Sequence, residues 1–261
     1  MKKEAEKVCD SSLVEGALSV FSILNHGSRK IECVYLRQDV DESDRKISAL
    51  IRKCQKANVP ITRRDEKFFA DKAIGITHGG VLAAVGDRSM QAPEALLKKK
   101  NGFFVYLCGM EDPYNFGYAI RSLYAAGVDG IFVTPRNWLS AAGISVRASA
   151  GATEKIPFAV AEDNEQFCLL AKKQGYRVVA ADENDATPHT KADLRRPLIL
   201  IIGGEKRGIP SHVLSVCHEK VVIAYGRAAD HSLSAAAAAA VLGFEVLRQN
   251  PISEVVRCMH Y

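Results

Sequence analysis

The sequence contains no long uninterrupted run of apolar residues, although about half of its 261 residues are apolar. A helix needs roughly 18 or more such residues in a row to cross a membrane, so we expect no membrane span. The first eight residues are mostly charged and no apolar segment follows them, so we also expect no secretory signal peptide. Together these absences predict a cytoplasmic protein that does not bind a membrane.

The spacing typical of metal and disulfide proteins is also missing. The seven cysteines are an odd number, and the chain has no CxxC pair and no clustered histidines. Zinc sites and disulfide frameworks usually show close, regular spacing, so we expect neither a bound metal nor a disulfide. The cysteines are predicted to be reduced, buried thiols. They are Cys9, Cys33, Cys54, Cys108, Cys168, Cys217 and Cys258.

The net charge of +5 is modest but unevenly distributed. Residues 1–100 hold 19 Lys and Arg against 14 Asp and Glu, whereas residues 101–261 hold 16 of each. Contact with a polyanion is therefore expected to begin in the first hundred residues, unless the basic residues form only a solvated face. The proposed phosphate track comprises Arg45, Lys46, Arg52, Lys53, Lys56, Arg63, Arg64, Lys67 and Lys72.

Residues 1–90 have the pattern of a small α/β unit. A helix is expected from Leu13, capped by Ser11 or Ser12, and it should end near Gly27. His78 precedes two glycines and is either a turn residue or an RNA contact. Residues 91–101 end in a lysine run and are predicted to be a linker. The other expected elements are strands at 31–36, 60–62 and 81–85 and a helix at 44–57.

Residues 102–261 alternate between strand and helix patterns. Such alternation predicts an α/β domain built on a parallel sheet. Strands are expected at 103–107, 130–133, 156–160, 177–180, 198–202 and 220–224. Helices are expected at 116–126, 142–152, 164–174, 211–216 and 233–248, the last containing six consecutive alanines at 235–240.

The stretch 198–210 joins an aliphatic run to a turn with three glycines. The run is typical of a strand that is covered on both faces. In open α/β sheets the loops after such strands form the ligand crevice, and glycines let the backbone approach a ligand. A simple tight turn is the alternative interpretation. The stretch matches neither the Walker A pattern nor GxGxxG.

Three segments share one property, which is that each follows a predicted strand: 111–121, 203–208 and 223–234. In this order and spacing they resemble the three motifs of the SpoU (TrmH-like) family of RNA ribose 2′-O-methyltransferases, in the SPOUT superfamily. In addition, the segments 14–17 and 78–81 resemble landmarks of the ribosomal-protein-like RNA-binding domain that often precedes the catalytic domain in this family.

The resemblance implies an RNA-binding domain at 1–90 and a methyltransferase domain at 102–261, whose last segment is threaded as a deep trefoil knot. It also implies S-adenosylmethionine as the cofactor, tRNA or rRNA as the substrate, and a homodimer, for which the alanine face offers close packing. Cofactor contacts are expected at Gly203, Gly204, Gly208, Ile223 and Leu233, and catalytic positions at Asn115, Arg121, Glu205 and Ser232.

Arg121 matches the arginine of the family's first motif, about one and a half helical turns beyond Asn115. The family role is either to accept the proton of the hydroxyl or to hold the adjacent phosphate. Holding the phosphate suits a guanidinium better, because this group is almost never neutral in proteins. A surface helix cap is the structural alternative.

The third motif departs from the family pattern. Ser234 stands where the family usually has Asn, Ala224-Tyr225 replaces Pro-Met, and one extra residue precedes Ser232. A hydroxyl has fewer hydrogen-bonding groups and a shorter reach than a carboxamide. The leading hypothesis is therefore an active RNA 2′-O-ribose methyltransferase, and the alternative is an RNA-binding protein of the same fold that has lost catalysis.

Overall fold

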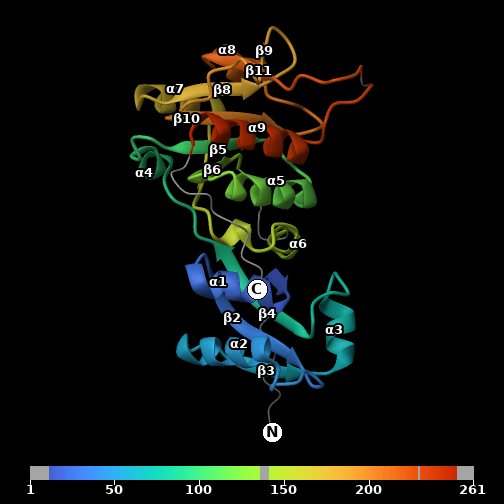
Figure 1. The fold of residues 1–261 in the computed structure, drawn as a ribbon. Coiled ribbons are helices and arrows are strands. Elements are labelled where there is room, and N and C mark those ends of the chain that lie inside the picture. Colours follow the sequence, from blue (N-terminus) through green and yellow to red (C-terminus); the bar gives the residue numbers. More distant parts are fainter. Residues whose placement is uncertain (1–11, 136–140, 229, 252–261) are drawn as a thin grey trace. The chain divides into compact units, whose positions relative to one another are not determined.

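The computed structural model describes residues 12–135, 141–228 and 230–251. These residues divide into two compact units (Figure 1). The first unit contains residues 12–89 and 141–155, and the second contains residues 90–135 and 156–251.

The first unit is built on a mixed four-stranded sheet in the order β1-β4-β2-β3. β4 is antiparallel to both neighbours, whereas β2 and β3 are parallel. Alternate apolar residues such as Val34 and Leu36 face a core that also contains Leu50 and Cys54. The elements are β1 (Ser12–Glu15), α1 (Ala17–His26), β2 (Arg29–Arg37), α2 (Arg45–Lys56), β3 (Ile61–Arg64), α3 (Glu66–Lys72) and β4 (Val81–Arg88).

The predicted helix from Leu13 is wrong at its start, because residues 12–15 form strand β1. β1 pairs along the edge of β4, and Gly16, with a φ of 84°, then turns the chain into α1. A Cβ disfavours this backbone conformation, so the glycine separates strand from helix. Helical spacing alone did not reveal this break. His78 serves as a turn residue, since its Nδ1 accepts the Gly80 N–H at 3.0 Å.

Residues 141–155 pack in the first unit, although the sequence predicted them within the C-terminal domain. They form α6 (Ala142–Ala148) and the short helix η1 (Ala152–Glu154). A Cβ on Gly143 would overlap the carbonyl oxygen of Leu13, so only glycine permits this approach. Arg147 pairs with the buried Glu15 at 2.9 Å.

Glu154 anchors the same segment from its other end. Its side chain is fully buried and lies 3.2 Å from both Arg29 and Arg88. Burial lowers the pKa of Arg88 to about 10, although the Glu154 carboxylate opposes this shift. A buried charge is tolerated when it is paired, so this cluster fixes residues 141–155 to β2 and β4.

The predicted linker at 91–101 is folded. It contains α4 (Pro93–Leu97), and both Leu96 and Leu97 are buried in the core of the second unit. The lysine run that suggested a linker follows directly after these two leucines.

The second unit is a seven-stranded sheet in the order β7-β6-β5-β10-β8-β11-β9, and every pairing is parallel. This confirms the predicted α/β fold with a parallel sheet. The strands are β5 (Phe103–Cys108), β6 (Gly130–Val133), β7 (Phe158–Val160), β8 (Arg177–Ala181), β9 (Thr187–Pro188), β10 (Leu198–Gly203) and β11 (Glu219–Val222). The central run of β10 is fully buried from Leu198 to Ile202.

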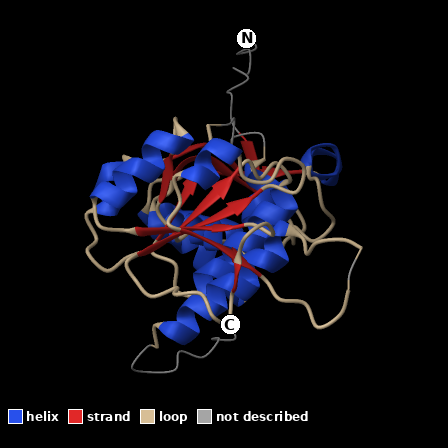
Figure 2. Cartoon of the chain, turned by 90° about the horizontal axis from the view of Figure 1, so that it is seen from above, coloured by secondary structure: helices blue, strands red, loops and turns tan. Residues whose placement is uncertain are grey.

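Helices lie on both sides of the sheet strands (Figure 2). One face packs against α4, α7 and α8 through residues that include Phe167 and Val213. On the other face α9 packs against α5 and β10. Covered faces explain why the strands are continuously apolar. The remaining helices are α5 (Pro113–Ala125), α7 (Asn164–Lys173), α8 (Ser211–Ser215) and α9 (Ala235–Gln249).

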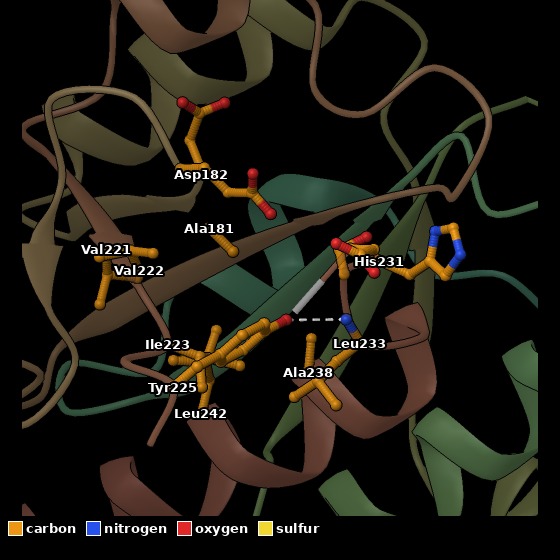
Figure 3. A pocket seen from close by; sticks show the side chains of 13 residues that line it. Ala181, Asp182, Val221, Val222, Ile223, Tyr225, His231, Leu233, Ala238 and Leu242 are labelled. Atoms are coloured by element: carbon orange, nitrogen blue, oxygen red, sulfur yellow. Dashed lines mark hydrogen bonds between the residues drawn. The ribbon is translucent and has the colours of Figure 1, made fainter. Parts of the chain in front are cut away.

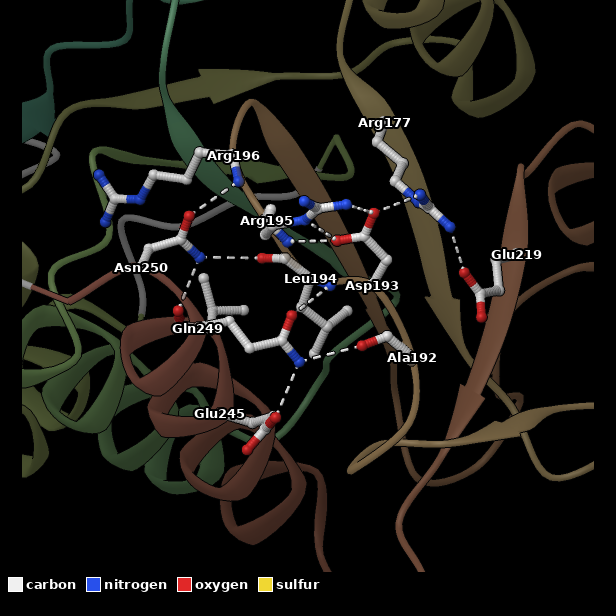
Figure 4. Close-up of polar contacts among 11 residues, drawn as sticks. Arg177, Ala192, Asp193, Leu194, Arg195, Arg196, Glu219, Glu245, Gln249 and Asn250 are labelled. Atoms are coloured by element: carbon white, nitrogen blue, oxygen red, sulfur yellow. Dashed lines mark hydrogen bonds and ion pairs between the residues drawn. The ribbon is translucent and has the colours of Figure 1, made fainter.

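The end of α9 is held by two side-chain amides (Figure 4). Gln249 accepts the Leu194 N–H at 2.8 Å and donates to the Ala192 carbonyl at 3.0 Å. Asn250 accepts the Arg196 N–H and donates to the Leu194 carbonyl, both at 3.0 Å. These amides satisfy main-chain groups of the segment that leads into β10.

The five cysteines in the described ranges are free thiols, while Cys9 and Cys258 lie outside those ranges. Cys54, Cys108 and Cys168 are buried, and Cys33 and Cys217 are half-buried. Burial raises the pKa of the Cys168 thiol to about 12, so this group is a poor nucleophile at neutral pH.

Candidate active site

The glycine loop (Gly203–Gly208) follows the central strand β10 and folds tightly back on itself. Gly204 and Gly208 form an isolated bridge, and the Gly208 N–H donates to the Gly204 carbonyl at 2.9 Å. A Cβ on Gly203 would lie 2.6 Å from the carbonyl carbon of Gly208, and one on Gly204 would overlap the Gly109 carbonyl oxygen. The glycines are therefore required for close backbone approach.

Asn115 and Glu205 meet beside this loop. The Asn115 Nδ2 donates to Glu205 Oε1 at 2.8 Å, and the Ala235 N–H approaches the same oxygen at 3.4 Å. Asn115 lies in the first turn of α5, where Asp112 caps the helix by accepting the Asn115 N–H at 2.7 Å. The first motif, the glycine loop and the start of α9 are thus joined through one carboxylate.

A cavity of about 510 Å³ lies at the carboxyl end of β8 and β11 (Figure 3). Ile223, Ser232 and Leu233 line it, as do Ala238 and Leu242 of α9. Its size falls within the usual range for small-molecule sites, and apolar walls with a few polar groups are typical of them. The rest of its lining is Ala181, Asp182, Glu183, Val221, Val222, Tyr225, Asp230 and His231.

The structure brings the sequence-predicted residues together in two groups. Ile223, Ser232 and Leu233 line the cavity. Asn115 and Glu205 are hydrogen-bonded to each other. Gly203, Gly204 and Gly208 shape the neighbouring turn and are not among the residues that line the cavity.

Arg121 lies on α5 with an exposed side chain. Among the described residues it has no acidic partner within ion-pair distance. Asn115, one and a half turns earlier, lies in the same helix. The guanidinium is therefore available to an anion from solvent.

Sequence reasoning missed the acidic side of the cavity. Asp182 and Glu183 follow β8 directly, and Asp230 belongs to the loop after β11. The rule that ligands bind beyond strand carboxyl ends applied to the predicted strand at 177–180 as well. The order of strands places β8 between β10 and β11, and this adjacency was not available from the sequence.

Ser234, the residue that replaces the family Asn, caps α9. Its hydroxyl accepts the Ala237 N–H at 3.2 Å. Serine is a favoured residue at this position because its oxygen satisfies an amide of the first helical turn. The substitution therefore has a structural role in this chain.

Within residues 12–135, 141–228 and 230–251, no group of three or more His, Cys, Asp or Glu side chains is arranged to hold a metal ion. In those same ranges no helix has the length and apolarity needed to cross a membrane.

Comparison with protein families gives two matches that together span most of the chain. Residues 102–244 match the model of the SpoU rRNA Methylase family. The chain belongs to the SpoU rRNA methylase family. Residues 13–90 match the model for RNA 2′-O ribose methyltransferase substrate binding. The part of this SpoU protein that matches the methylase model includes residues 141–155, although these residues pack in the first unit.

Curated relatives match long stretches of the SpoU chain. The 23S rRNA (guanosine-2′-O-)-methyltransferase RlmB of Shewanella oneidensis is 28% identical over 242 residues, which are 91% of this chain and 97% of that protein. The putative TrmH family tRNA/rRNA methyltransferase YacO of Bacillus subtilis is 31% identical over 192 residues, which are 70% of this chain and 76% of that protein.

Solved structures show the same fold. An AdoMet-bound rRNA methyltransferase from Sinorhizobium meliloti matches with a TM-score of 0.79 at 23% identity, covering 94% of this chain and 89% of that chain. The SpoU methyltransferase AviRb from Streptomyces viridochromogenes, in complex with AdoMet, matches with a TM-score of 0.75 at 21% identity and covers 92% and 91% of the two chains.

Proposed function

We propose that the protein transfers a methyl group from S-adenosylmethionine to a ribose 2′-hydroxyl of RNA. The observation that carries this proposal is the cavity lined by Ile223, Ser232 and Leu233, next to the hydrogen-bonded pair Asn115 and Glu205, in a chain of the SpoU family.

The residues of the cavity fit S-adenosylmethionine. Ile223 and Leu233 offer apolar walls for the adenine, and the turn at Gly203, Gly204 and Gly208 offers nearby main-chain groups for the ribose. Asp182, Glu183 and Asp230 supply negative charge for a ligand that carries a sulfonium and an ammonium group. Bound there, the cofactor would supply an electrophilic methyl group with its leaving group already in place.

The protein's own part in the reaction is mainly positioning. We assign Arg121 to the phosphate beside the reactive ribose, because its guanidinium is exposed and remains charged. Asn115 and Glu205 fix the start of α5 against the glycine loop, and we assign Ser232, which lines the cavity, to the incoming ribose. The alternative role of Arg121, accepting the hydroxyl proton, would require a dry site around it.

Ribosomal RNA is the substrate class that we favour. The curated relative with the most complete coverage of those described above is named as a 23S rRNA (guanosine-2′-O-)-methyltransferase. We also propose a cytoplasmic location, as expected from the sequence.

The first unit is proposed to hold the RNA through α2. This helix carries Arg45, Lys46, Arg52 and Lys56 on its exposed side and no acidic residue. Two members of the predicted phosphate track are engaged internally. Arg63 pairs with Glu42 and donates to the Arg37 carbonyl at 2.7 Å, while Arg64 stacks over the Phe68 ring at 5.3 Å. The other members of the predicted phosphate track lie on α2 and α3, and most of them are on α2.

A homodimer is supported by the outer face of α9. Val241 and Phe244 are 36% and 48% exposed, and Tyr124 on the adjacent α5 is 45% exposed. Large apolar side chains gathered on neighbouring helices often mark interfaces. The predicted alanine face serves a different purpose in part, because Ala235 and Ala239 are buried within the chain. Phe244→Glu should convert a dimer into a monomer in light scattering.

The deep trefoil knot remains a proposal that rests on the family resemblance. It is supported by the order of strands in the sheet. β10 lies between β5 and β8, although both of these strands come before β10 in the sequence. The later helix α9 then packs against α5 and β10.

The function is tested with purified protein, S-adenosylmethionine labelled in its methyl group, and RNA from cells that lack the protein. Mass spectrometry of the digested RNA should show one labelled 2′-O-methylnucleoside. Arg121→Ala should lower single-turnover transfer by ~10²-fold or more, the usual loss when a positioning contact is removed, while calorimetry shows unchanged cofactor affinity. Equal rates for both proteins would remove Arg121 from the mechanism.

The alternative, an RNA-binding protein without catalysis, is favoured by one observation: Ser234 is occupied in capping α9. The same assay separates the two functions. RNA binding without transfer by the wild type, together with transfer by Ser234→Asn, would support the alternative.

RNA binding is tested separately by replacing Arg45, Lys46, Arg52 and Lys56 with alanine. The slope of log affinity against log salt should become shallower by several units, because fewer counterions are released, while cofactor affinity stays the same. An unchanged slope would exclude α2 as the RNA contact.

A further inference from the structure

The latch loop (Ile223–Ser234) lies between β11 and α9, and its described residues, 223–228 and 230–234, have little main-chain structure of their own. Residues 224–228 and 230–234 are all exposed. No backbone-to-backbone hydrogen bond joins two of its described residues to each other. Ordering such a segment costs conformational entropy for every residue that is fixed, so side chains must define its position.

In the part of the chain that the structure describes, contacts from outside the loop hold its two ends. At the first end, the Ala224 N–H donates to His189 Nδ1 at 3.3 Å. At the second end, Ser234 caps α9 and Glu205 receives the Ala235 N–H. Leu233, which lines the cavity, lies just inside the second end.

Tyr225 connects the two ends across the loop. Its hydroxyl oxygen accepts the Leu233 N–H at 2.8 Å (Figure 3). The two side chains are 43% and 42% exposed, and both line the same cavity. The hydrogen bond therefore joins two residues that are eight positions apart in the loop, and it fixes one cavity wall relative to the other.

We propose that Tyr225 is a positioning residue of the cofactor site: it holds Leu233 in place before the cofactor binds. This inference rests on the proposed function, because it takes the cavity to be the S-adenosylmethionine site. The family pattern has Pro-Met at 224–225, and neither side chain offers a hydroxyl. Tyr225 is thus a feature by which this chain shapes its own third motif.

The consequence is a site that is arranged in advance of binding. When a loop is already ordered, the ligand does not have to offset the cost of ordering it. Removing the hydroxyl should release Leu233 without disturbing the sheet, because the freed amide is close to solvent and water can bind it. The proposed role of Tyr225 is to hold the cavity wall, so the effect should appear in binding rather than in turnover.

The first experiment tests the latch without any assumption about function. Arg227 is the one trypsin site between Ile223 and Ser234, and it is exposed. Limited digestion of wild type and Tyr225→Phe should show cleavage after Arg227 several-fold faster in the variant, with other sites unchanged. Tyr118→Phe is the matched control, because Tyr118 is a 49% exposed tyrosine of the same unit outside the cavity. Equal cleavage rates in all three proteins would overturn the proposal.

The second experiment measures S-adenosylmethionine affinity of the same three proteins by calorimetry. Tyr225→Phe should bind roughly five- to tenfold more weakly, the range expected for one hydrogen bond, and Tyr118→Phe should bind like wild type. In turnover the KM for the cofactor should rise by the same factor, with kcat changed less than about twofold.

The results distinguish a failure of the role proposed for Tyr225 from a failure of the proposed function. Wild-type affinity for Tyr225→Phe would overturn the positioning role while leaving the proposed function intact. If the wild type itself binds no S-adenosylmethionine, the proposed function and the cofactor role of Tyr225 both fail. The digestion result then decides whether Tyr225 still orders the loop.

Discussion

The glycine loop after β10 and the latch loop after β11 lie at the same edge of one sheet, but they are held in different ways. In the glycine loop, backbone packs on backbone, and positions such as Gly204 have no room for a Cβ. In the latch loop the described residues after Ile223 are exposed, and the contacts of Tyr225, His189 and Ser234 define its path. The first kind of loop leaves a pattern of glycines in the sequence, whereas the second kind does not.

The largest expected effect is a difference in stability between two variants, each of which adds one methyl group to one of the loops. Gly204→Ala would push a Cβ into the Gly109 carbonyl and should lower the free energy of unfolding by about 2–3 kcal/mol or prevent folding. Gly226→Ala should be neutral or stabilising by up to about 1 kcal/mol, because nothing lies within 4 Å of its Cβ. Urea unfolding of both variants measures the difference, and equal losses would contradict the comparison.

Glu205 belongs to the glycine loop but contacts Ala235, the residue directly after the latch loop, so it tests whether the two loops act together. Glu205→Ala removes the acceptor for Asn115 and Ala235 and should lower methyl transfer roughly tenfold. Glu205→Gln keeps an acceptor oxygen and should retain most of the rate. Single-turnover transfer is the measurement, and an identical loss in both variants would indicate that charge matters more than the hydrogen bonds.

Ser234 tests how far the latch loop stabilises the helix that follows it. Ser234→Ala should cost about 1 kcal/mol of stability, the usual loss for an N-cap. Ser234→Asn restores the family residue and should leave stability unchanged, since asparagine caps equally well. Thermal unfolding distinguishes them. A loss of equal size in the asparagine variant would mean that the cap is not what stabilises this end of the loop.

The smallest effect should come from His218, just before the strand that leads into the latch loop. Partial burial lowers its pKa below the ordinary 6.5, and Lys172 and Arg177 act in the same direction. Its Nδ1 accepts the Val178 N–H at 3.0 Å, which requires the neutral ring.

Because the folded-state pKa of His218 is the lower one, its contribution to stability is complete above about pH 6.5 and is lost as the pH falls through the folded-state value. Urea unfolding at pH 7, 6 and 5 should show a slightly smaller decline for His218→Gln than for wild type. Parallel declines would show that this imidazole does not contribute.

Local patterns predicted much of the second unit and the glycine loop. The aliphatic run of β10 and the spacing of α7 each contain their own signal, and both elements agree with the structure within a residue or two. The acid at Asp182 enters the cavity because β8 and β11 are neighbours, and that neighbourhood is a property of the whole sheet.

The misplaced elements share one physical cause, which is contact between residues far apart in the chain. β1 is a strand because β4 offers an edge for it, and α6 belongs to the first unit because Gly143 fits against Leu13. A window of neighbouring residues contains neither partner. The Tyr225 hydrogen bond was missed for a similar reason, since its acceptor and donor are eight residues apart in a loop without periodicity.

The segment 141–155 has a consequence for how this protein is inherited and engineered. A fragment that begins at residue 102 would carry Glu154 without Arg29 and Arg88 and without the strands β2 and β4 that carry them. A fragment that ends at residue 90 would lack α6 and expose the surface that it covers. The substrate-binding and catalytic parts therefore cannot be separated at a single position in the gene. A chimera that takes the substrate-binding part of this enzyme must also take residues 141–155 from within its catalytic sequence.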